Sequence, residues 1–351
     1  METAIILTAG LLSTGDAKTA HGLIRESGRY RIVGVVDHQH AGSDAGEVLD
    51  GRSRGIPVVS NMEEALLMAP RWCIVGVATL GGKFPDSMLA DVRIALERGV
   101  SVVNGLHDFL VDRPDMVALA AASNARIIDI RKPKPFGALH FWTGEINRIN
   151  TPVVAVIGTD CSLGKRTTSK LMVRIAAAAG IHAEMIYTGQ TGWLQGGKYG
   201  FIFDSTLNDF VSGELEHAIV QCVREENPDL VLLEGQSALR NPSGPAGAEL
   251  LRSGGAKHVV LVHAPKRKYY EHNPEWGEIP SLASEIELIA AYGAQVVGIA
   301  INTEGCTAAE AADFQQHYQQ QFGIPVSLPL TDGCGPLLPV LQALTGKPVG
   351  V

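Results

Sequence analysis

Short apolar runs alternate with helical patterns along the first part of the chain. The runs that favour strands are 4–9, 30–36, 57–59, 73–78, 100–104 and 126–130. Apolar residues with helical spacing fall between them, at 17–27, 62–68, 87–98 and 107–122. Strands that alternate with helices are typical of a parallel sheet covered on both faces. The pattern therefore predicts an α/β fold with a Rossmann-like N-terminal domain over residues 1–150.

The alternation resumes at Thr151 and continues through the second half of the chain. A helix is expected at 210–225, and this pattern indicates a second parallel sheet in a domain over residues 151–351. The strands expected in this domain are 153–157, 183–187, 230–233, 259–263, 296–302 and 325–328.

Residues 131–150 break this rhythm and are expected to connect the two domains. The stretch begins stiff and basic, because Pro133 and Pro135 each fix φ and restrict the residue before them. Two interpretations stay open, a linker alone or a segment that brings basic side chains to a cleft. Those side chains are Arg131, Lys132 and Lys134.

Composition limits the class of protein. A chain of 351 residues is long enough for two domains. Its net charge of −8, without a basic block, argues against a nucleic-acid partner. No apolar run reaches the roughly 18 residues of a membrane span, and residues 1–3 lack the basic start of a secretory signal. Five scattered cysteines without a Cys-x-x-Cys pair fit a reducing compartment without disulfides or zinc. We expect a cytoplasmic homo-oligomer without a metal or a membrane partner.

The strongest chemical signal is a glycine-rich loop that follows the strand at 153–157. It runs from Gly158 to Gly164, is followed by Lys165 and leads into a helical pattern. Strand, glycine-rich loop, lysine and helix is the order of a phosphate-binding P-loop. Successive backbone N–H groups and the helix N-terminus attract an anion, and the lysine reaches the outer phosphates. The second domain is therefore expected to be P-loop NTPase-like. Its candidate cofactor-binding residues are Gly158, Thr159, Asp160, Cys161, Ser162, Leu163, Gly164, Lys165, Arg166 and Thr167.

Two departures from the usual loop change the expected ligand. Five residues separate Gly158 from Gly164, where the usual pattern has four. Arg166 follows the lysine, where a Ser or Thr hydroxyl normally binds Mg²⁺. Thr167 or Thr168 remains able to supply such a hydroxyl. The loop therefore favours binding a diphosphate over hydrolysing a triphosphate.

Polar residues at strand ends are further candidates, because ligands of open α/β sheets bind at the carboxyl ends of the strands. Glu234 follows the strand at 230–233 and can face phosphates, through Mg²⁺ or water, or act as a base toward an amine. Asn302 is either a turn residue or a cofactor-binding residue whose amide pairs with an adenine edge. Asp209 is either a helix cap or part of a substrate site.

Two stretches offer positive charge for an anionic ligand. Residues 266–268 are three consecutive cations after the strand at 259–263, and they form either an anion site or a solvated charge run. Arg240 lies shortly after Glu234, where its planar guanidinium can grip a carboxylate.

The N-terminal domain offers a weaker nucleotide signal. Its first loop, from Gly10 to Gly15, lacks the G-x-G-x-x-G pattern of dinucleotide folds. Asp37 ends the second strand, where an acidic residue can accept a hydrogen bond from a ribose hydroxyl. An NAD(P)-linked enzyme therefore stays an alternative.

Three of these stretches together resemble one bacterial family. They are the loop at 158–168, the loop from Thr188 to Gly192, and the segment from Glu234 to Gln236. The family pairs a Rossmann-like N-terminal half with a C-terminal P-loop half, was long labelled as of unknown function and includes D-glutamate N-acetyltransferase. The resemblance covers nearly the whole chain. The P-loop half is also similar to dethiobiotin synthetase, which opens with the same Gly-Thr-Asp but has Thr after the lysine, where this chain has Arg166.

The resemblance implies an N-acetyltransferase that moves an acetyl group from acetyl-CoA to the amine of D-glutamate. The P-loop would hold the CoA diphosphate, with Arg166 or residues 266–268 available to the 3′-phosphate. Glu234 or Asp209 is the candidate base, and amides at 189–192 would stabilise an oxyanion. An ATP- and Mg²⁺-dependent ligase or kinase of the dethiobiotin-synthetase type is the alternative. The candidate substrate-binding residues are Gln190, Thr191, Arg240 and Lys266.

Overall fold

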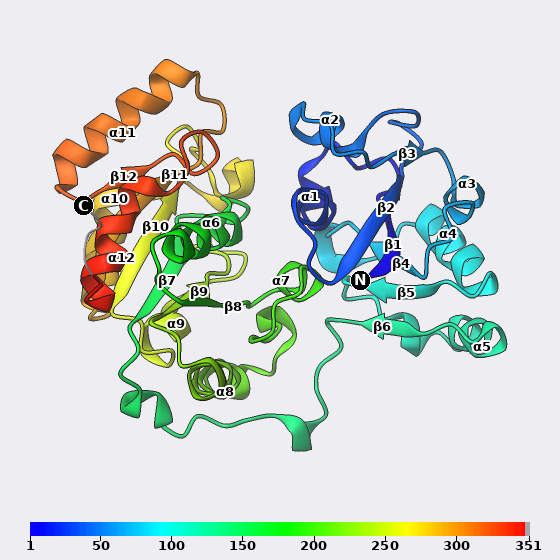
Figure 1. Cartoon of the computed structure of the whole chain (residues 1–351), viewed down its shortest axis with the longest axis horizontal. Helices are drawn as coiled ribbons and strands as arrows, with labels where there is room; N and C mark the ends of the chain where they lie inside the picture. The colour runs from blue at the N-terminus through cyan, green and yellow to red at the C-terminus, as the bar shows by residue number, and fades with distance from the viewer. Residues whose placement is uncertain (348–351) are drawn as a thin grey trace. The chain divides into compact units, whose positions relative to one another are not determined.

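The chain divides into two compact units in a computed structural model that describes residues 1–347 (Figure 1). Unit 1 comprises Met1–Lys134 together with Gly189–Gly197. Unit 2 begins at Pro135, is interrupted by that short segment after Thr188, and resumes at Lys198. The change of unit at residue 134 falls inside the stretch 131–150 that was expected to connect the domains.

Unit 1 is built on a six-stranded parallel sheet in the order β3-β2-β1-β4-β5-β6. Its strands are β1 (Glu2–Leu7), β2 (Tyr30–Val36), β3 (Val58–Val59), β4 (Trp72–Val75), β5 (Ser101–Asn104) and β6 (Ile127–Asp129). Its helices are α1 (Lys18–Arg25), α2 (Ala45–Asp50), α3 (Met62–Leu66), α4 (Asp86–Glu97), α5 (Pro114–Ser123) and α7 (Gln190–Leu194).

Both faces of this sheet are buried. Along β1, Ile5 and Leu7 belong to one hydrophobic cluster, and Ala4 and Ile6 belong to another. Burial on both faces explains why the strand reads as a continuous apolar run rather than as an alternating one.

Unit 2 is built on a second six-stranded parallel sheet, in the order β12-β11-β10-β7-β9-β8. Its strands are β7 (Val153–Gly158), β8 (Ala183–Ile186), β9 (Leu230–Glu234), β10 (His258–His263), β11 (Gln295–Ile301) and β12 (Val326–Ser327). Its helices are α6 (Lys165–Ala178), α8 (Asn208–Glu226), α9 (Ala248–Arg252), α10 (Leu282–Ala291), α11 (Ala308–Phe322) and α12 (Leu338–Thr345).

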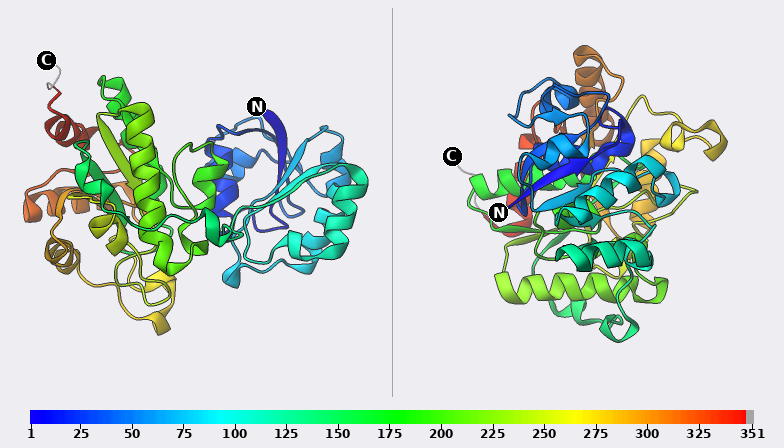
Figure 2. Two further views of the ribbon diagram at one scale, coloured as in Figure 1. Left: turned by 90° about the horizontal axis from the view of Figure 1, so that it is seen from below. Right: turned by 90° about the vertical axis from the view of Figure 1, so that its right-hand side faces the viewer.

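The strand β7 lies inside the second sheet, between β10 and β9, with helices on both sides (Figure 2). Ala155 and Ile157 pack into one cluster, and Val154 and Val156 pack into the cluster on the other face. The loop after β7 is therefore held by a rigid, doubly covered strand, and the ends of β9 and β10 flank it. Both predicted parallel sheets and the α/β fold are confirmed.

Two expectations about helices were wrong. The helix predicted at 107–122 begins only at Pro114, which suits the first helical position because proline lacks an N–H. The residues before it form a turn in which the N–H groups of Leu110 and Val111 donate to the Asp129 carboxylate, at 3.1 and 2.9 Å. The stretch from Thr188 to Gly192 was expected to be a loop, yet α7 begins within it at Gln190.

Helix α7 is held by contacts within unit 1. Gln195, just after the helix, donates from Nε2 to the carbonyl oxygens of Gly22 and Glu26, at 2.7 and 3.0 Å. The Arg29 guanidinium stacks over the Trp193 ring at 4.1 Å and donates to the Trp193 carbonyl. These contacts join α7 to residues of α1 and of the turn after it that are distant in sequence, so the local sequence pattern did not predict the helix.

Within residues 1–347, none of the helices has the length and apolar character needed to cross a bilayer.

Candidate functional site

The loop between β7 and α6 has the geometry of an anion cradle. Gly164 takes a φ of +91° and Ser162 a φ of +55°, so the chain turns sharply before α6 begins at Lys165. The N–H of Thr159 donates to the Val262 carbonyl at 3.0 Å. For the N–H groups of residues 160–164, no acceptor is found among the protein atoms of residues 1–347. Such a run of unpaired donors at a helix N-terminus attracts a phosphate.

Lys165 holds this loop together. Its side chain is 7% exposed, and Nζ donates to the carbonyl oxygens of Asp160 and Ser237, at 2.7 and 2.8 Å. Gly235 makes this approach possible, because a Cβ there would lie 2.4 Å from the Val156 carbonyl oxygen and 3.1 Å from the Lys165 side chain. The ammonium is therefore fixed beside the cradle rather than extended into solvent.

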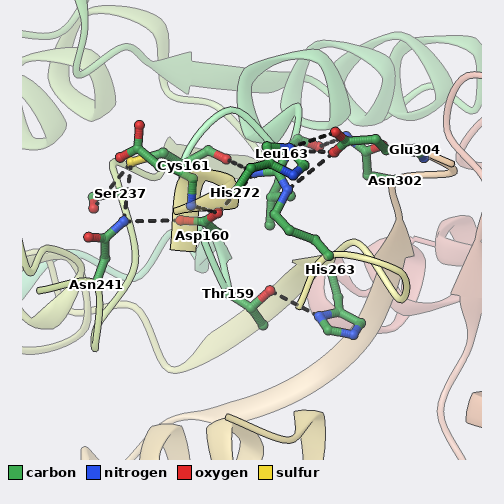
Figure 3. Close-up of polar contacts among 12 residues, drawn as sticks. Thr159, Asp160, Cys161, Leu163, Ser237, Asn241, His263, His272, Asn302 and Glu304 are labelled. Atoms are coloured by element: carbon green, nitrogen blue, oxygen red, sulfur yellow. Dashed lines mark hydrogen bonds and ion pairs between the residues drawn. The ribbon is translucent and has the colours of Figure 1, made fainter. Parts of the chain in front are cut away.

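Asp160 shapes the loop from beneath. Its carboxylate is fully buried and accepts hydrogen bonds from Asn241 Nδ2, Arg267 NH1 and the Glu271 N–H, at 3.0, 2.9 and 2.8 Å (Figure 3). Arg267 also donates to the Cys161 carbonyl at 2.7 Å. The Asp160 side chain thus faces the protein interior, which leaves its backbone N–H as the group available to a ligand.

Cys161 contributes in the same way. Burial raises the pKa of its thiol, and Lys165 only partly offsets this. A raised pKa lowers the thiolate fraction, so the side chain is a poor nucleophile at neutral pH.

Glu234 lies at the carboxyl end of β9 and faces the loop. It is 3% exposed, and burial raises the pKa of its carboxyl while Arg166 opposes that rise. Arg166 NH1 lies 3.4 Å from Oε1, and the Thr188 N–H donates to Oε2 at 3.3 Å. Arg166 therefore forms an ion pair with the acidic residue at the strand end, the residue that in P-loop enzymes usually faces Mg²⁺.

Asn302 and Asp209, two other candidates of unit 2, lie in different surroundings. Asn302 donates from Nδ2 to the Leu163 carbonyl at 3.1 Å and accepts from the Glu304 N–H, so it fastens the P-loop. Asp209 lies exposed in the first turn of α8. Within residues 1–347, no hydrogen bond or ion pair joins Asp209 to the P-loop.

The two cations proposed for substrate carboxylates each contact a glutamate. Arg240 Nε lies 2.9 Å from Glu285 Oε1, and Lys266 Nζ lies 2.6 Å from Glu310 Oε1. Burial raises the pKa of the Glu285 carboxyl.

Gln190 and Thr191 lie in α7 and therefore in unit 1. Gln190 Nε2 donates to Thr19 Oγ1 at 3.1 Å, and its Oε1 accepts from Arg131 at 3.0 Å. The hydroxyls of Thr191 and Thr19 are 3.3 Å apart. Both side chains are buried in these contacts.

Asp37 has a different role from the ribose contact that its position suggested. Its buried carboxylate accepts from the Thr8 hydroxyl and from the N–H groups of Gly10 and Leu12, at 2.7, 3.0 and 3.0 Å. His40 Nδ1 lies 2.9 Å from its other oxygen. The carboxylate closes the first loop of unit 1 and so gives no support to a dinucleotide site.

Two residues of the site were missed as individual candidates. Arg267 looked like the middle of a solvated charge run, yet its side chain is only 6% exposed. His263 ends β10, is 8% exposed, and its Nδ1 lies 2.9 Å from Thr159 Oγ1 (Figure 3). A polar residue at the end of the strand next to β7 was the available signal for His263.

Comparisons with known proteins agree with this architecture. A family model described as a P-loop domain of unknown function, DUF1611, matches residues 140–338, and its Rossmann-like N-terminal counterpart matches residues 38–133. A relative from Tritonibacter scottomollicae named D-glutamate N-acetyltransferase is 31% identical over 293 residues, 81% of this chain and 84% of its own. One of the same name from a Pseudoalteromonas species is 30% identical over 280 residues, 77% and 81% of the two chains.

A solved structure shows the same fold along nearly the whole length. The crystal structure of a DUF1611 family protein from Anabaena variabilis matches with a TM-score of 0.90 at 30% identity, over 98% of this chain and 100% of that one. The resemblance drawn from the loop at 158–168 and its companion segments is therefore confirmed. The chain belongs to the DUF1611 family, which joins a Rossmann-like N-terminal domain to a C-terminal P-loop domain.

Proposed function

We propose that this protein transfers an acetyl group from acetyl-CoA to the amine of D-glutamate. Two relatives that match most of the chain are named D-glutamate N-acetyltransferase. The observation that carries the proposal is the cradle at 160–164, which offers unpaired N–H donors and a buried lysine beside an arginine. All five cysteines are free, as they would be in a reducing cytoplasm.

The cradle fits the diphosphate of a CoA thioester. The amides of residues 160–164 would bind its oxygens, and Lys165 would supply the positive charge. Acetyl-CoA supplies the activated acetyl group, and transfer of that group to an amine requires no divalent ion. Arg166 favours metal-independent transfer over Mg²⁺-dependent chemistry. Its guanidinium is next to the Glu234 carboxylate, the group that would otherwise be directed at Mg²⁺.

Glu234 is the base that the arrangement favours. The ammonium of an amino acid must lose a proton before its nitrogen can attack a carbonyl carbon, and a carboxylate whose pKa is raised accepts that proton closer to neutral pH. Glu234 has such a raised pKa because it is buried, and it lies beside the cradle. Asp209 is exposed and shares no contact with the loop in the described residues, so it is the weaker candidate.

The carboxylates of the acceptor require cations. Arg240 and Lys266 keep that role in the proposal, and each would exchange a glutamate partner for a substrate carboxylate. Gln190 and Thr191 are engaged with Thr19 within unit 1, and their contact with the acceptor stays a prediction from the sequence.

The decisive experiment measures thiol release from acetyl-CoA by the purified chain, with D-glutamate, L-glutamate or no acceptor. We expect release that depends on D-glutamate and does not change when divalent ions are chelated. Glu234→Gln should lower kcat by about 10²–10⁴-fold, the usual contribution of a general base. The matched control is Glu275→Gln, which changes an exposed carboxylate at a turn of the same unit.

Two results would contradict the proposal. Absence of CoA release with every amino acid tried would reject acetyl transfer. Mg²⁺-dependent ATP turnover that Arg166→Thr enhances would support the ligase or kinase alternative instead.

A further inference from the structure

A cavity of about 310 Å³ in unit 2 is lined by residues next to the P-loop, and apart from the stretch 266–268 none of its lining residues was assigned above to acetyl transfer. His263 from the end of β10 lines it, and the rest of its lining comes from the loop after β10, the start of α10 and the end of α11. Its volume is at the small end of ligand pockets, which are typically about 300–1,000 Å³. It therefore suits one part of a nucleotide rather than a whole CoA molecule.

Two residues that line the cavity, His263 and Arg267, make hydrogen bonds with residues of the P-loop. His263 Nδ1 lies 2.9 Å from the hydroxyl of Thr159, which follows Gly158 in the P-loop (Figure 3). Arg267, which also lines the cavity, donates to the Asp160 carboxylate at 2.9 Å and to the Cys161 carbonyl at 2.7 Å. These two side chains therefore link the lining of the cavity to the P-loop.

The lining suits a flat, uncharged ring. Tyr318 and Phe322 contribute aromatic surface from α11, and Ile279 and Leu282 contribute aliphatic surface. His263 is more than nine-tenths buried, and among residues 1–347 its Nε2 has no hydrogen-bond partner. Burial lowers the pKa of this imidazole to about 4, so it stays neutral at pH 7 and can hydrogen-bond a heterocycle without attracting a carboxylate.

A phosphate can be accommodated beside the ring. Lys268 lines the same cavity, and its Nζ lies 3.0 Å from Glu278 Oε1. Both side chains are about 60% exposed, and an exposed pair of this kind contributes little to stability. Lys268 can therefore exchange Glu278 for a phosphate at small cost.

We infer that this cavity binds the adenine of CoA, with His263 hydrogen-bonding the base and Lys268 pairing with the ribose 3′-phosphate. The inference rests on the proposed function and extends it to the nucleotide end of the donor. It assigns the side of the P-loop toward β10 to the adenosine and leaves the side toward β9, with Glu234, to the thioester. A 3′-phosphate distinguishes CoA from ATP, so this site would also select the donor.

Calorimetry on the full chain tests the inference without turnover. Adenosine 3′,5′-bisphosphate should bind and compete with CoA. Lys268→Ala should weaken both ligands about tenfold, as expected for one charge-assisted contact, and leave dephospho-CoA unchanged. Ala283→Met, which adds volume at the cavity lining, should weaken all three ligands at an unchanged Tm. Lys257→Ala is the matched control, because this exposed lysine precedes the opposite end of β10.

The outcomes separate the inference from the proposed function. If the parent protein binds CoA but both cavity variants bind it equally well, the inference is wrong and acetyl transfer stands. If Ala283→Met raises the KM for D-glutamate and not the affinity for CoA, the cavity is the acceptor site and the inference is overturned. If the parent binds neither CoA nor the bisphosphate and releases no CoA, both fail.

Discussion

Replacing Asp160 by asparagine tests whether the buried network beneath the P-loop holds the cradle in shape. In the parent protein, Oδ1 accepts from Asn241, and Oδ2 accepts from Arg267 and from the Glu271 N–H. In the asparagine, an NH₂ group replaces one of these two oxygens. At either position its N–H groups would face other hydrogen-bond donors and would have no acceptor there. Asn241 cannot turn over freely, because its own oxygen accepts from the N–H and the hydroxyl of Ser243.

The expected loss of stability follows from the burial of the pair. Removing one partner of a buried ion pair costs about 3–5 kcal/mol, since the other charge is left without compensation. Arg267 keeps Glu304 as a second, partly exposed partner, so we expect the lower end of that range, about 3 kcal/mol. For a unit of this size, such a change lowers Tm by about 6–12 °C.

Thermal unfolding of Asp160→Asn measures this loss. Under the proposed acetyl transfer, the KM for acetyl-CoA would report the state of the cradle. Adding Arg267→Met should recover part of the stability, because the second change removes the unpaired charge. Glu278→Gln, which breaks an exposed pair in the same unit, should change stability by less than about 0.5 kcal/mol. An Asp160→Asn protein that unfolds at the parent's temperature with an unchanged KM would refute the reasoning.

Three further predictions concern stability. Gly235→Ala should destabilise unit 2 by about 1–3 kcal/mol, because the added Cβ would lie 2.4 Å from a carbonyl oxygen of β7. Gly244→Ala is the control and should be nearly neutral, because a Cβ there would have nothing within 4 Å, so equal Tm values for the two variants would contradict the prediction. Glu234→Gln should gain stability relative to the parent as pH rises from 5 to 8, because a carboxyl whose folded pKa is raised contributes less to stability as it ionises. A Tm difference independent of pH would contradict the raised pKa of Glu234. Asp44→Ala should lower the free energy of unfolding by about 1–2 kcal/mol at pH 7, because Asp44 caps α2 and four N–H groups lower the pKa of its carboxyl to about 2. In urea titrations the difference from the parent should shrink as pH falls from 5 to 2, and a constant difference would refute this role of Asp44.

The parallel sheets were predictable because their signal is local and repeated. Runs such as 153–157 are apolar throughout, since each strand is buried on both faces, and the helical spacing between them leaves few other arrangements. The P-loop was equally readable, since the amides of its residues follow one another along the chain. Pro114 also marked where α5 begins, although the apolar residues before it obscured that limit.

The side-chain roles were less predictable, because each depends on partners far away in the chain. Asp160 and Thr159 were candidates because they lie in the P-loop, but the sequence did not show that their side chains contact Arg267 and His263, more than a hundred residues away. Arg267 resembles its neighbours Lys266 and Lys268 in sequence, and only packing distinguishes the buried cation from the exposed ones.

Helix α7 and the 310 Å³ cavity also depend on contacts between segments that are far apart in the sequence. Residues 189–197 are glycine-rich and polar, and they become helical because α1 and Arg29 offer them acceptors, donors and an aromatic contact. The cavity exists because three separate segments leave a space beside His263. Hydrophobic periodicity and the spacing of loop residues depend on neighbours a few positions apart, so the sequence alone was enough to predict the strands and the P-loop. Which side chains are buried, paired or open to a ligand depends on contacts between distant segments, and those exist only once the chain has folded.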